Sequence, residues 1–333
     1  GRIGFRTSPM CRNRRIAGHV QGLVQPPWKE GSLTLLDQKL VSVVIPTYNH
    51  AEFLRLALQS VMDQSYPHWE AIVVDNHSED HTDEVLRSFS DSRIRVIKIH
   101  NNGVIAASRN RGIAAANGKY VAFLDSDDTW YPEKLTTCIA AFQDEIGLVS
   151  HGLRWIGARQ REMYPGPESR ATFDALIDHG NCITPSATIV LKSHLDAVGG
   201  FSEIPVLATS EDYHLWIKLA RLGVKTCFLR QILGEYRIHA GNQSSAVDRH
   251  LRSVLGVVDE FLPPIEDGNR EQTLRRRRRY SLAYYGAGRT LQYGKHYRDS
   301  LPYFFRAIKA WPFAVRNYAA GLIGIIGSLR FPR

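Results

Sequence analysis

Three carboxylates stand close together at Asp125, Asp127 and Asp128, with Ser126 between the first two. Such a cluster is costly to hold unless a cation or several hydrogen-bond donors compensate its charge. Mg²⁺ and Mn²⁺ prefer oxygen ligands and commonly join one or two carboxylates to a substrate diphosphate. In a turn that leaves a strand, the alternate spacing of Asp125 and Asp127 can aim one side chain at a ribose and the other at a metal. The alternative is an Asx-rich turn that caps a helix beginning near Pro132.

The elements that must position this cluster alternate between strand and helix. Apolar runs rich in β-branched residues predict buried strands, and apolar residues at helical spacing predict helices. The predicted strands cover 40–45, 70–75, 93–99 and 120–124, and the predicted helices cover 52–63, 82–89 and 106–116. This order predicts an α/β fold, with a doubly wound, mostly parallel sheet and helices on both of its faces.

Polar residues follow three of these strands. Thr47, Tyr48 and Asn49 follow the first strand, Asp75 ends the second, and the 125–128 cluster follows the fourth. Ligands of such sheets bind outside the carboxyl ends of the strands. We therefore expect the three loops to converge on one crevice.

The remaining chain is less patterned. We expect strands at 146–153 and 224–229, a β-rich stretch at 183–191, a loop and helix over 166–180, and a helix over 213–222. After Pro263-Pro264 the residues change to small, aromatic and basic types. Segments 280–288 and 293–310 resemble one helix-turn-helix unit of the tetratricopeptide type, which cannot bury its own face. We expect this small helical extension to pack on the rest of the chain or on a partner.

Five motifs in order resemble those of the family 2 inverting glycosyltransferases, which have the GT-A fold of the nucleotide-diphospho-sugar transferase superfamily. The motifs are Val41–Asn49, Val73–Asn76 with Ser78 and Asp80, Ser108–Ile113, Phe123–Asp128, and Ser210–Asp212 with Leu215 and Trp216. Together they cover about residues 40–245. The resemblance implies transfer of a sugar from a nucleotide-diphosphate donor, with UDP or dTDP as the nucleotide, to a hydroxyl of a lipid-linked or polysaccharide acceptor, as in cell-envelope polysaccharide biosynthesis.

The same resemblance implies a role for each matching residue of the donor site. Pro46, Thr47 and Tyr48 would line the base and ribose pocket, Asp75 would accept a hydrogen bond from the base, Asp125 would meet the ribose with Ser126 beside it, and Asp127 would ligate Mn²⁺ or Mg²⁺. Arg109 would lie near the donor phosphates or sugar; the alternative is an ordinary arginine on a helix surface. Asn76 stands where this family often has a second aspartate. This difference puts the base specificity in question more than nucleotide binding itself.

Inversion needs a base that removes the proton of the acceptor hydroxyl. Glu211-Asp212 resembles the family's acidic pair, and we assign the base to Asp212; the alternative is helix capping by an acidic pair. His239 is a candidate metal ligand or phosphate donor, or an ordinary loop histidine. Gly241, Ser244 and Ser245 would suit a mobile lid, and segment 181–186 would help to shape the acceptor pocket.

Two other classes of function were weighed against this one. A nucleotidyltransferase would be expected to carry a glycine-rich basic phosphate loop, yet Pro46 to His50 contains no glycine. Neither a GxxxxGK[ST] loop nor a GxGxxG fingerprint follows the first strand, which argues against a kinase, an ATPase and a dehydrogenase. A catalytically inactive module of a polysaccharide assembly complex is the other alternative. Such a module would have no chemical reason to keep Asp125, Asp127 and Asp212 together.

The net charge of +9 is unevenly distributed along the 333 residues. Residues 1–40 carry a net +5 and residues 270–333 a net +12, so the middle carries −8. Basic terminal segments on an acidic central domain indicate binding to an anionic membrane surface rather than to nucleic acid. The alternative is that the basic residues form a solvated helix face. The apolar run 319–329 is too short to span a bilayer.

These patterns give three segments and a location. We expect a poorly ordered basic segment at 1–39 without a secretory signal, a catalytic domain at 40–262, and a basic helical extension at 263–333. Four scattered cysteines predict neither a disulfide framework nor a zinc site. We expect a cytoplasmic protein that lies peripherally on the cytoplasmic face of the membrane.

Overall fold

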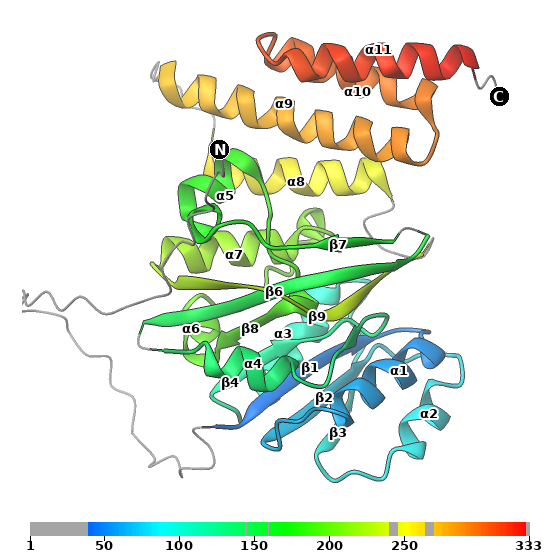
Figure 1. Cartoon of the computed structure of the whole chain (residues 1–333), viewed down its shortest axis with the longest axis vertical. Coiled ribbons are helices and arrows are strands. Elements are labelled where there is room, and N and C mark those ends of the chain that lie inside the picture. The colour runs from blue at the N-terminus through cyan, green and yellow to red at the C-terminus, as the bar shows by residue number, and fades with distance from the viewer. Residues whose placement is uncertain (1–38, 144, 159, 240–245, 264–269, 331–333) are drawn as a thin grey trace, which may run out of the picture. The chain divides into compact units, whose positions relative to one another are not determined.

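The computed structural model describes residues 39–143, 145–158, 160–239, 246–263 and 270–330 (Figure 1). The predicted N-terminal segment 1–39 lies outside these residues except for Lys39. All described residues fall in one compact unit, the C-terminal helices included. The domain boundaries at 39/40 and 262/263 stay a prediction.

The first half of the fold is a parallel α/β sheet, as predicted. Strands β1 (Val41–Thr47), β2 (Trp69–Asp75), β3 (Ile94–Lys98) and β4 (Tyr120–Phe123) pair in the order β3-β2-β1-β4, and all three pairings are parallel. Helices α1 (Ala51–Met62), α2 (Thr82–Ser88) and α3 (Ile105–Ala115) connect them.

Both faces of this sheet are buried, which explains why its strands read as continuous apolar runs. On β1, Val43 and Ile45 pack in one core cluster with Leu58 of α1, whereas Val44 packs in the other with Ile113 of α3. Successive side chains of a strand point to opposite faces. Each face of β1 is therefore covered by a different helix.

The second half makes the sheet mixed. Strands β5 (Thr129–Trp130), β6 (Ile146–Gly157), β7 (Arg161–Met163), β8 (Thr188–Leu191) and β9 (Lys225–Ile238) extend it in the order β4-β8-β6-β9-β5, with β7 on β6. Strand β8 runs antiparallel to both β4 and β6, while β6 and β9 are parallel. The parallel arrangement thus holds for the first half, and antiparallel pairs join the rest to it.

Short helices surround this second half. They are α4 (Lys134–Ala140), α5 (Phe173–His179), α6 (Lys192–Ala197), α7 (Glu211–Arg221) and α8 (Val247–Phe261). The sequence predicted a helix at α4, α5 and α7, but not at α6 and α8. Strand β9 also runs nine residues beyond the predicted end at Leu229, to Ile238. It carries the chain to the edge of the sheet where the carboxylate cluster lies.

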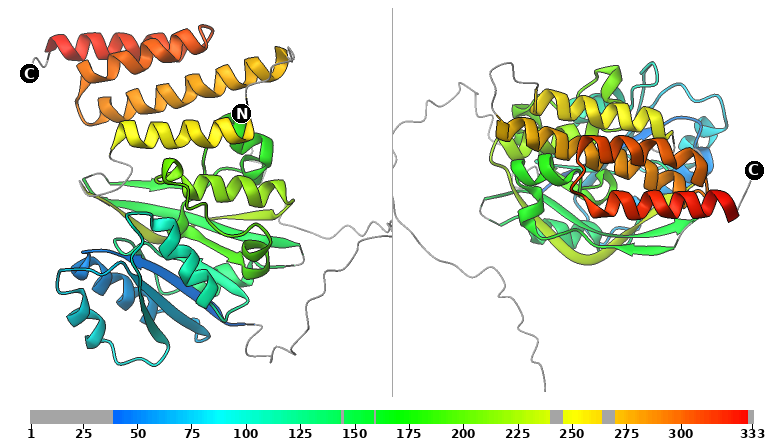
Figure 2. Two further views of the ribbon diagram at one scale, coloured as in Figure 1. Left: turned by 180° about the vertical axis from the view of Figure 1, so that it is seen from behind. Right: turned by 90° about the horizontal axis from the view of Figure 1, so that it is seen from above.

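Three further helices follow one another away from the sheet. Helices α9 (Arg270–Tyr293), α10 (Tyr297–Ala310) and α11 (Val315–Arg330) form successive layers beyond α8 (Figures 1 and 2). Helix α9 contacts α5 and α8, as expected for an extension that cannot bury its own face. No helix of the described ranges is long and apolar enough to cross a membrane.

Three arginines of the run 275–279 join α9 to α5, α7 and α8. Arg275 forms ion pairs with Asp174 and Asp178 of α5, at 2.7 and 2.5 Å. Arg276 pairs with Asp259 of α8, and Arg279 is buried against Tyr213 of α7. These three arginines therefore form neither a free basic cluster for a membrane nor a solvated basic helix face.

Helix α3 approaches β1 so closely that one position needs glycine. A Cβ atom on Gly112 would lie 2.3 Å from Cγ1 of Val44, inside the van der Waals distance. Gly286 of α9 offers a contrast, because a Cβ there would meet nothing within 4 Å.

We predict that Gly112→Ala lowers the free energy of unfolding by about 1–3 kcal/mol, because the added methyl overpacks the core. Gly286→Ala is the matched control and should raise it by about 0.5–1 kcal/mol, since alanine is the better helix former. Urea unfolding of both variants measures the difference. Equal effects of the two substitutions would contradict this account of Gly112.

Candidate active site

The structure brings the predicted loops to one edge of the sheet. Thr47 and Asp75 are direct neighbours in the β1–β2 register, and the N–H of Leu124 donates to the carbonyl of Val44 at 3.1 Å. The cluster that begins at Asp125 therefore leaves the sheet beside β1, and β2 ends on the other side of β1. Helix α7, which begins at Glu211, reaches the same place through its contact with Arg109.

Asp75 presents an unused acceptor at this edge. Its side chain is fully buried, and its Oδ1 accepts hydrogen bonds from the N–H and hydroxyl of Ser78 at 3.0 and 2.6 Å. Its Oδ2 has no hydrogen-bond partner among the described residues. Lys98 Nζ lies 3.6 Å from Oδ2 but is bonded to Asp83. A buried acceptor of this kind costs free energy unless a ligand supplies the donor.

The other residues predicted for the base pocket surround the same point. Pro46 and Thr47 are buried, and the hydroxyl of Thr47 also has no partner among the described residues. Tyr48 follows them and is 50% exposed, so its ring is open to a ligand. Asn49 has a φ of 52° and donates its N–H to Ser78, which ties this loop to the end of β2.

Arg109 is a buried cation between two carboxylates. It is 3% exposed, and its two terminal nitrogens donate to Asp125 Oδ1 at 2.7 Å and to Glu211 Oε1 at 2.6 Å. Burial disfavours the charged guanidinium, but Asp125 and Glu211 together raise the pKa of Arg109 above its ordinary value. The alternative of a surface arginine is wrong, and the predicted contact with the donor stays a prediction.

Asp127 faces His239. The Oδ2 atom of Asp127 lies 2.9 Å from Nε2 of His239, which follows the end of β9. Burial and the charge of Asp125 raise the pKa of Asp127, while the hydrogen bond with His239 opposes that change. His239 is therefore part of the carboxylate cluster, whereas the predicted lid residues in 240–245 lie outside the described residues.

A carboxylate oxygen and an imidazole nitrogen at this separation fit Mn²⁺, and the carboxylate also fits Mg²⁺. Within the described ranges, no group of three or more His, Cys, Asp or Glu side chains could hold a metal alone. Asp127 and His239 would therefore need oxygen ligands from a diphosphate and water, which is how Mg²⁺ is commonly bound with phosphates.

Asp128 has a structural place. It is 1% exposed, and its Oδ1 accepts the backbone N–H of Arg237 at 2.9 Å, which joins the cluster to β9. Burial and the charges of Asp127 and Asp125 raise its pKa well above the ordinary range. Helix α4 begins at Lys134 and its N-cap, Glu133, makes no side-chain capping bond. The Asx-turn alternative, in which this cluster caps the helix, is therefore wrong.

Asp212 lies in the first turn of α7. Its Oδ2 accepts a hydrogen bond from Asn181 Nδ2 at 3.0 Å, and its Oδ1 accepts the N–H of Tyr213 at 2.6 Å. Burial and the neighbouring charge of Glu211 raise the pKa of Asp212 to about 7, against the opposing effects of Tyr213, Arg109 and Asn181. A carboxylate with this pKa is suited to general base catalysis near neutral pH.

Glu211 and Asp212 lie in the first turn of α7, where negative charge is favoured, but the N-cap residue is Ser210 and it makes no side-chain capping bond. Glu211 Oε2 accepts the N–H of Thr209 at 2.8 Å. Thr209 has a φ of 92°, a conformation that a β-branched residue rarely adopts. Strained backbone of this kind clusters at functional sites.

Three residues at this edge, His50, Tyr236 and Glu211, received no role of their own from the sequence. His50 Nδ1 lies 3.1 Å from Ser126 Oγ, and its ring centroid is 5.8 Å from that of His239. Burial and the four carboxylates of Asp125, Asp127, Asp128 and Asp212 raise the pKa of Tyr236, so its hydroxyl stays protonated among them. The third is Glu211. His50 directly follows the motif that ends at Asn49, and Asn181 begins the predicted segment 181–186, but their hydrogen-bond partners are 76 and 31 positions away.

Comparison with known proteins assigns this chain to a protein family. The model of Glycosyl transferase family 2 matches residues 42–193. The chain is 32% identical over 212 residues to a putative teichuronic acid biosynthesis glycosyltransferase, TuaG, of Bacillus subtilis, covering 62% of this chain and 82% of that protein. The chain belongs to glycosyltransferase family 2. It is therefore a glycosyltransferase, which confirms the predicted class of enzyme.

A second relative and two solved structures agree with this assignment. A UDP-Glc:alpha-D-GlcNAc-diphosphoundecaprenol beta-1,3-glucosyltransferase of Escherichia coli, WfgD, is 29% identical over 231 residues, 68% of this chain and 88% of its own. Residues 1–349 of Staphylococcus aureus TarS with UDP-GlcNAc superpose with a TM-score of 0.58 at 18% identity, covering 88% and 93% of the two chains. A mannosyltransferase of Pyrobaculum calidifontis with GDP-Man and Mn²⁺ also gives 0.58, at 17% identity and 91% and 84% coverage. The family 2 chain has the GT-A fold.

We predict that Arg109→Gln lowers the free energy of unfolding by about 3–5 kcal/mol, because it leaves two carboxylates without their cation in a buried place. Arg111→Gln is the matched control on the same helix; its side chain is exposed, so the change should stay within about 0.5 kcal/mol. Denaturant unfolding of both variants tests this. A near-neutral Arg109→Gln would show that the pairing contributes little.

Proposed function

We propose that this family 2 glycosyltransferase moves a sugar, with inversion, from UDP- or dTDP-sugar to a hydroxyl of a lipid-linked or polysaccharide acceptor. One observation carries the proposal. A bridge of buried hydrogen bonds, from Asp125 through Arg109 to Glu211, joins the carboxylate cluster to the helix that bears Asp212. A module without catalytic activity would not need to hold a carboxylate with a pKa of about 7 next to this bridge.

The donor side of the proposal rests on Asp75 and the cluster after β4. The buried Oδ2 of Asp75 lacks a donor among the described residues, and the N3–H of uracil or thymine would supply one. Asp125 follows at the end of β4, where the ribose would lie. In this arrangement Pro46, Thr47 and Tyr48 enclose the base from the end of β1, and Ser126 lies beside His50 at the cluster.

The acceptor side rests on Asp212. Its carboxylate would take the proton of the acceptor hydroxyl while the oxygen forms a bond to the anomeric carbon, and the bond from that carbon to the diphosphate breaks on the opposite face. Asn181 fixes one oxygen of Asp212 and the N–H of Tyr213 holds the other. Segment 181–186 also reaches the cluster, because Ser186 Oγ accepts the N–H of Asp125 at 3.1 Å. It would thus help to shape the acceptor pocket.

Asp127 and His239 would hold a divalent metal, Mn²⁺ or Mg²⁺, against the donor diphosphate. Such an ion, when bound, neutralises the charge of a departing nucleotide diphosphate. The mannosyltransferase with the same fold contains Mn²⁺, which supports this assignment. The distance of 2.9 Å between the two side chains supports a shared role.

The acceptor and the location are proposed from the relatives and the C-terminal helices. The named activity of WfgD is transfer to a diphosphoundecaprenol-linked sugar, and TuaG is named for teichuronic acid biosynthesis. We place this chain in the same kind of cell-envelope polysaccharide synthesis, at the cytoplasmic face of the membrane. Segment 270–333 carries fourteen basic and two acidic residues. Polybasic segments gain about 1 kcal/mol per Lys or Arg near an anionic surface.

We predict that kcat/KM rises with pH through an apparent pKa near 7, because Asp212 must lose its proton to act as a base. Asn181→Ala removes a hydrogen bond that stabilises the carboxylate. The midpoint should therefore move to higher pH. Transfer of radiolabelled sugar, measured over pH 5 to 9, gives both profiles.

Asp212→Asn is the control for that experiment: it should still bind UDP with Mn²⁺ but lose at least about a hundredfold in transfer rate. Transfer at the wild-type rate, or a midpoint that Asn181→Ala leaves in place, would remove Asp212 as the base.

Asp127→Ala should abolish the Mn²⁺-dependent part of UDP binding, because it removes one of the two side chains that would hold the ion. Asp196→Ala, an exposed residue of α6, is the surface control and should bind as wild type does. Thermal shift with UDP, with and without Mn²⁺, measures binding, since a ligand of the folded state raises the melting temperature. An unchanged Mn²⁺-dependent shift in Asp127→Ala would contradict its role.

A further inference from the structure

A pocket of about 370 Å³ lies in the C-terminal helices, between α9 and the beginning of α11. Arg278 and Ser281 line it from α9. Trp311, Phe313, Val315 and Arg316 line it from the turn between α10 and α11 and from the first residues of α11. It belongs to none of the elements that carry the proposed active site.

Two of the residues that line the pocket are arginines. Arg278 and Arg316 are both exposed, and neither is paired with Asp or Glu among the described residues. Arg316 lies over the ring of Tyr285, with its CZ atom 5.1 Å from the centroid. Three neighbours of Arg278 in the run 275–279 are directed into the fold. Arg278 differs from these three, because it is exposed, lines this pocket and has no acidic partner among the described residues.

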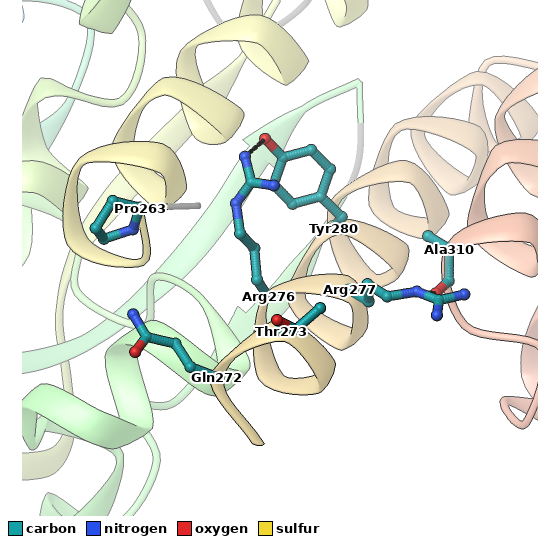
Figure 3. Close-up of a pocket in the computed structure, with 7 residues that line it drawn as sticks. All are labelled: Pro263, Gln272, Thr273, Arg276, Arg277, Tyr280 and Ala310. Atoms are coloured by element: carbon teal, nitrogen blue, oxygen red, sulfur yellow. Dashed lines mark hydrogen bonds between the residues drawn. The ribbon is translucent and has the colours of Figure 1, made fainter. Parts of the chain in front are cut away.

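A second hollow on α9 shows the contrast (Figure 3). It has a volume of about 210 Å³ and is also lined by two arginines, Arg276 and Arg277. Arg276 donates to the hydroxyl of Tyr280 at 2.8 Å and pairs with Asp259, while Arg277 Nε donates to the carbonyl of Ala310 at 3.2 Å. Arg276 thus has an acidic partner in Asp259, so this hollow is lined by one arginine without an acidic partner among the described residues, whereas the larger pocket is lined by two.

Helix α11 presents its large apolar side chains outward. Its buried positions are small or polar: Asn317, Ala320, Gly324 and Gly327. A Cβ on Gly327 would lie 2.4 Å from the ring of Tyr297, so this face lies close against α10. The exposed apolar residues recur at helical spacing from the pocket onward: Val315, Leu322, Ile326 and Leu329, which are 79, 57, 55 and 78% exposed.

This apolar stripe and the pocket are continuous, because Phe313 and Val315 line the pocket and are 76 and 79% exposed. A second copy of the chain is a poor occupant, since the exposed Arg278 and Arg316 of one copy would repel those of the other. An anionic bilayer matches both properties, because its phosphates attract arginine and its acyl chains accept apolar side chains.

We infer that this pocket binds the phosphodiester headgroup of an anionic phospholipid. Arg278 and Arg316 hold the phosphate oxygens through charge-assisted hydrogen bonds. Trp311 lies at the level of the headgroups, where indole rings concentrate, and Phe313 and Val315 enter the acyl region. The inference rests on the membrane association in the proposed function and adds a defined lipid site to it.

The test is a calorimetric titration of the full chain with dihexanoyl-phosphatidylglycerol, kept below its critical micelle concentration. It measures the affinity for the lipid. We expect saturable binding that weakens at least about tenfold in Arg278→Gln/Arg316→Gln, which removes both charged contacts. Arg298→Gln/Arg306→Gln removes two exposed arginines of α10 and is the matched control; its affinity should stay within about twofold. All four residues are exposed, and equal melting temperatures would verify the folding of both variants.

Competing ligands and vesicles separate the outcomes. Inorganic phosphate that competes as well as the lipid would overturn the inference in favour of a simple anion site, and so would equal losses in both double variants. Vesicles of phosphatidylglycerol and phosphatidylcholine test membrane association on its own. Sedimentation with these vesicles but no saturable binding of the short-chain lipid would overturn the pocket and leave the proposed function intact. No sedimentation at low or high salt would overturn both.

Discussion

The guanidinium of Arg109 is a buried cation held between carboxylates from two distant parts of the chain. Asp125 follows β4 and Glu211 begins α7, and both bonds are shorter than 2.8 Å. A buried charge costs several kcal/mol unless its partners are fixed around it. The ion bridge therefore holds α3, the carboxylate cluster and α7 in one arrangement. The position of Asp212 relative to the donor site depends on it, because Asp212 is the residue after Glu211.

The parallel half of the fold was predictable because its information is local. Its strands are buried on both faces, so they appear in the sequence as continuous apolar runs. Polar residues mark the point where each run ends. The elements of the other half depend on contacts between residues far apart in the sequence, which local sequence patterns do not predict. Strand β9 continues past Leu229 through Arg230 and Gln231, which look like a loop because this part of the strand is more polar. Helix α8 had a usable signal in the spacing of Leu251, Val254 and Val258, which recur at helical intervals.

The candidate site divides in the same way. Its carboxylates were predicted because they stand at strand ends or in a motif that resembles a known family. His239 and segment 181–186 were also predicted to belong to the site. The contacts themselves were not predicted, since Asp127–His239 and Asp212–Asn181 join positions 112 and 31 residues apart. The raised pKa of Asp212 depends first on burial, which only the folded chain supplies, and then on the charge of its sequence neighbour Glu211. Sequence can identify the charged groups, but their pKa values and pairings follow from packing.

The arginine run of α9 shows that the charge of a segment is not the charge of its surface. Read as a sequence, 275–279 is a polybasic cluster; in the fold, Arg275, Arg276 and Arg279 pair with or pack on α5, α8 and α7. Ion pairs with acidic side chains use the charge internally, so these arginines attract an anionic surface much less than their number suggests. Attraction to a membrane then depends on basic residues that the fold leaves exposed, such as Arg278 and Arg316. Because these two flank a pocket that opens onto the apolar stripe of α11, charge and apolar area act at the same place on the surface.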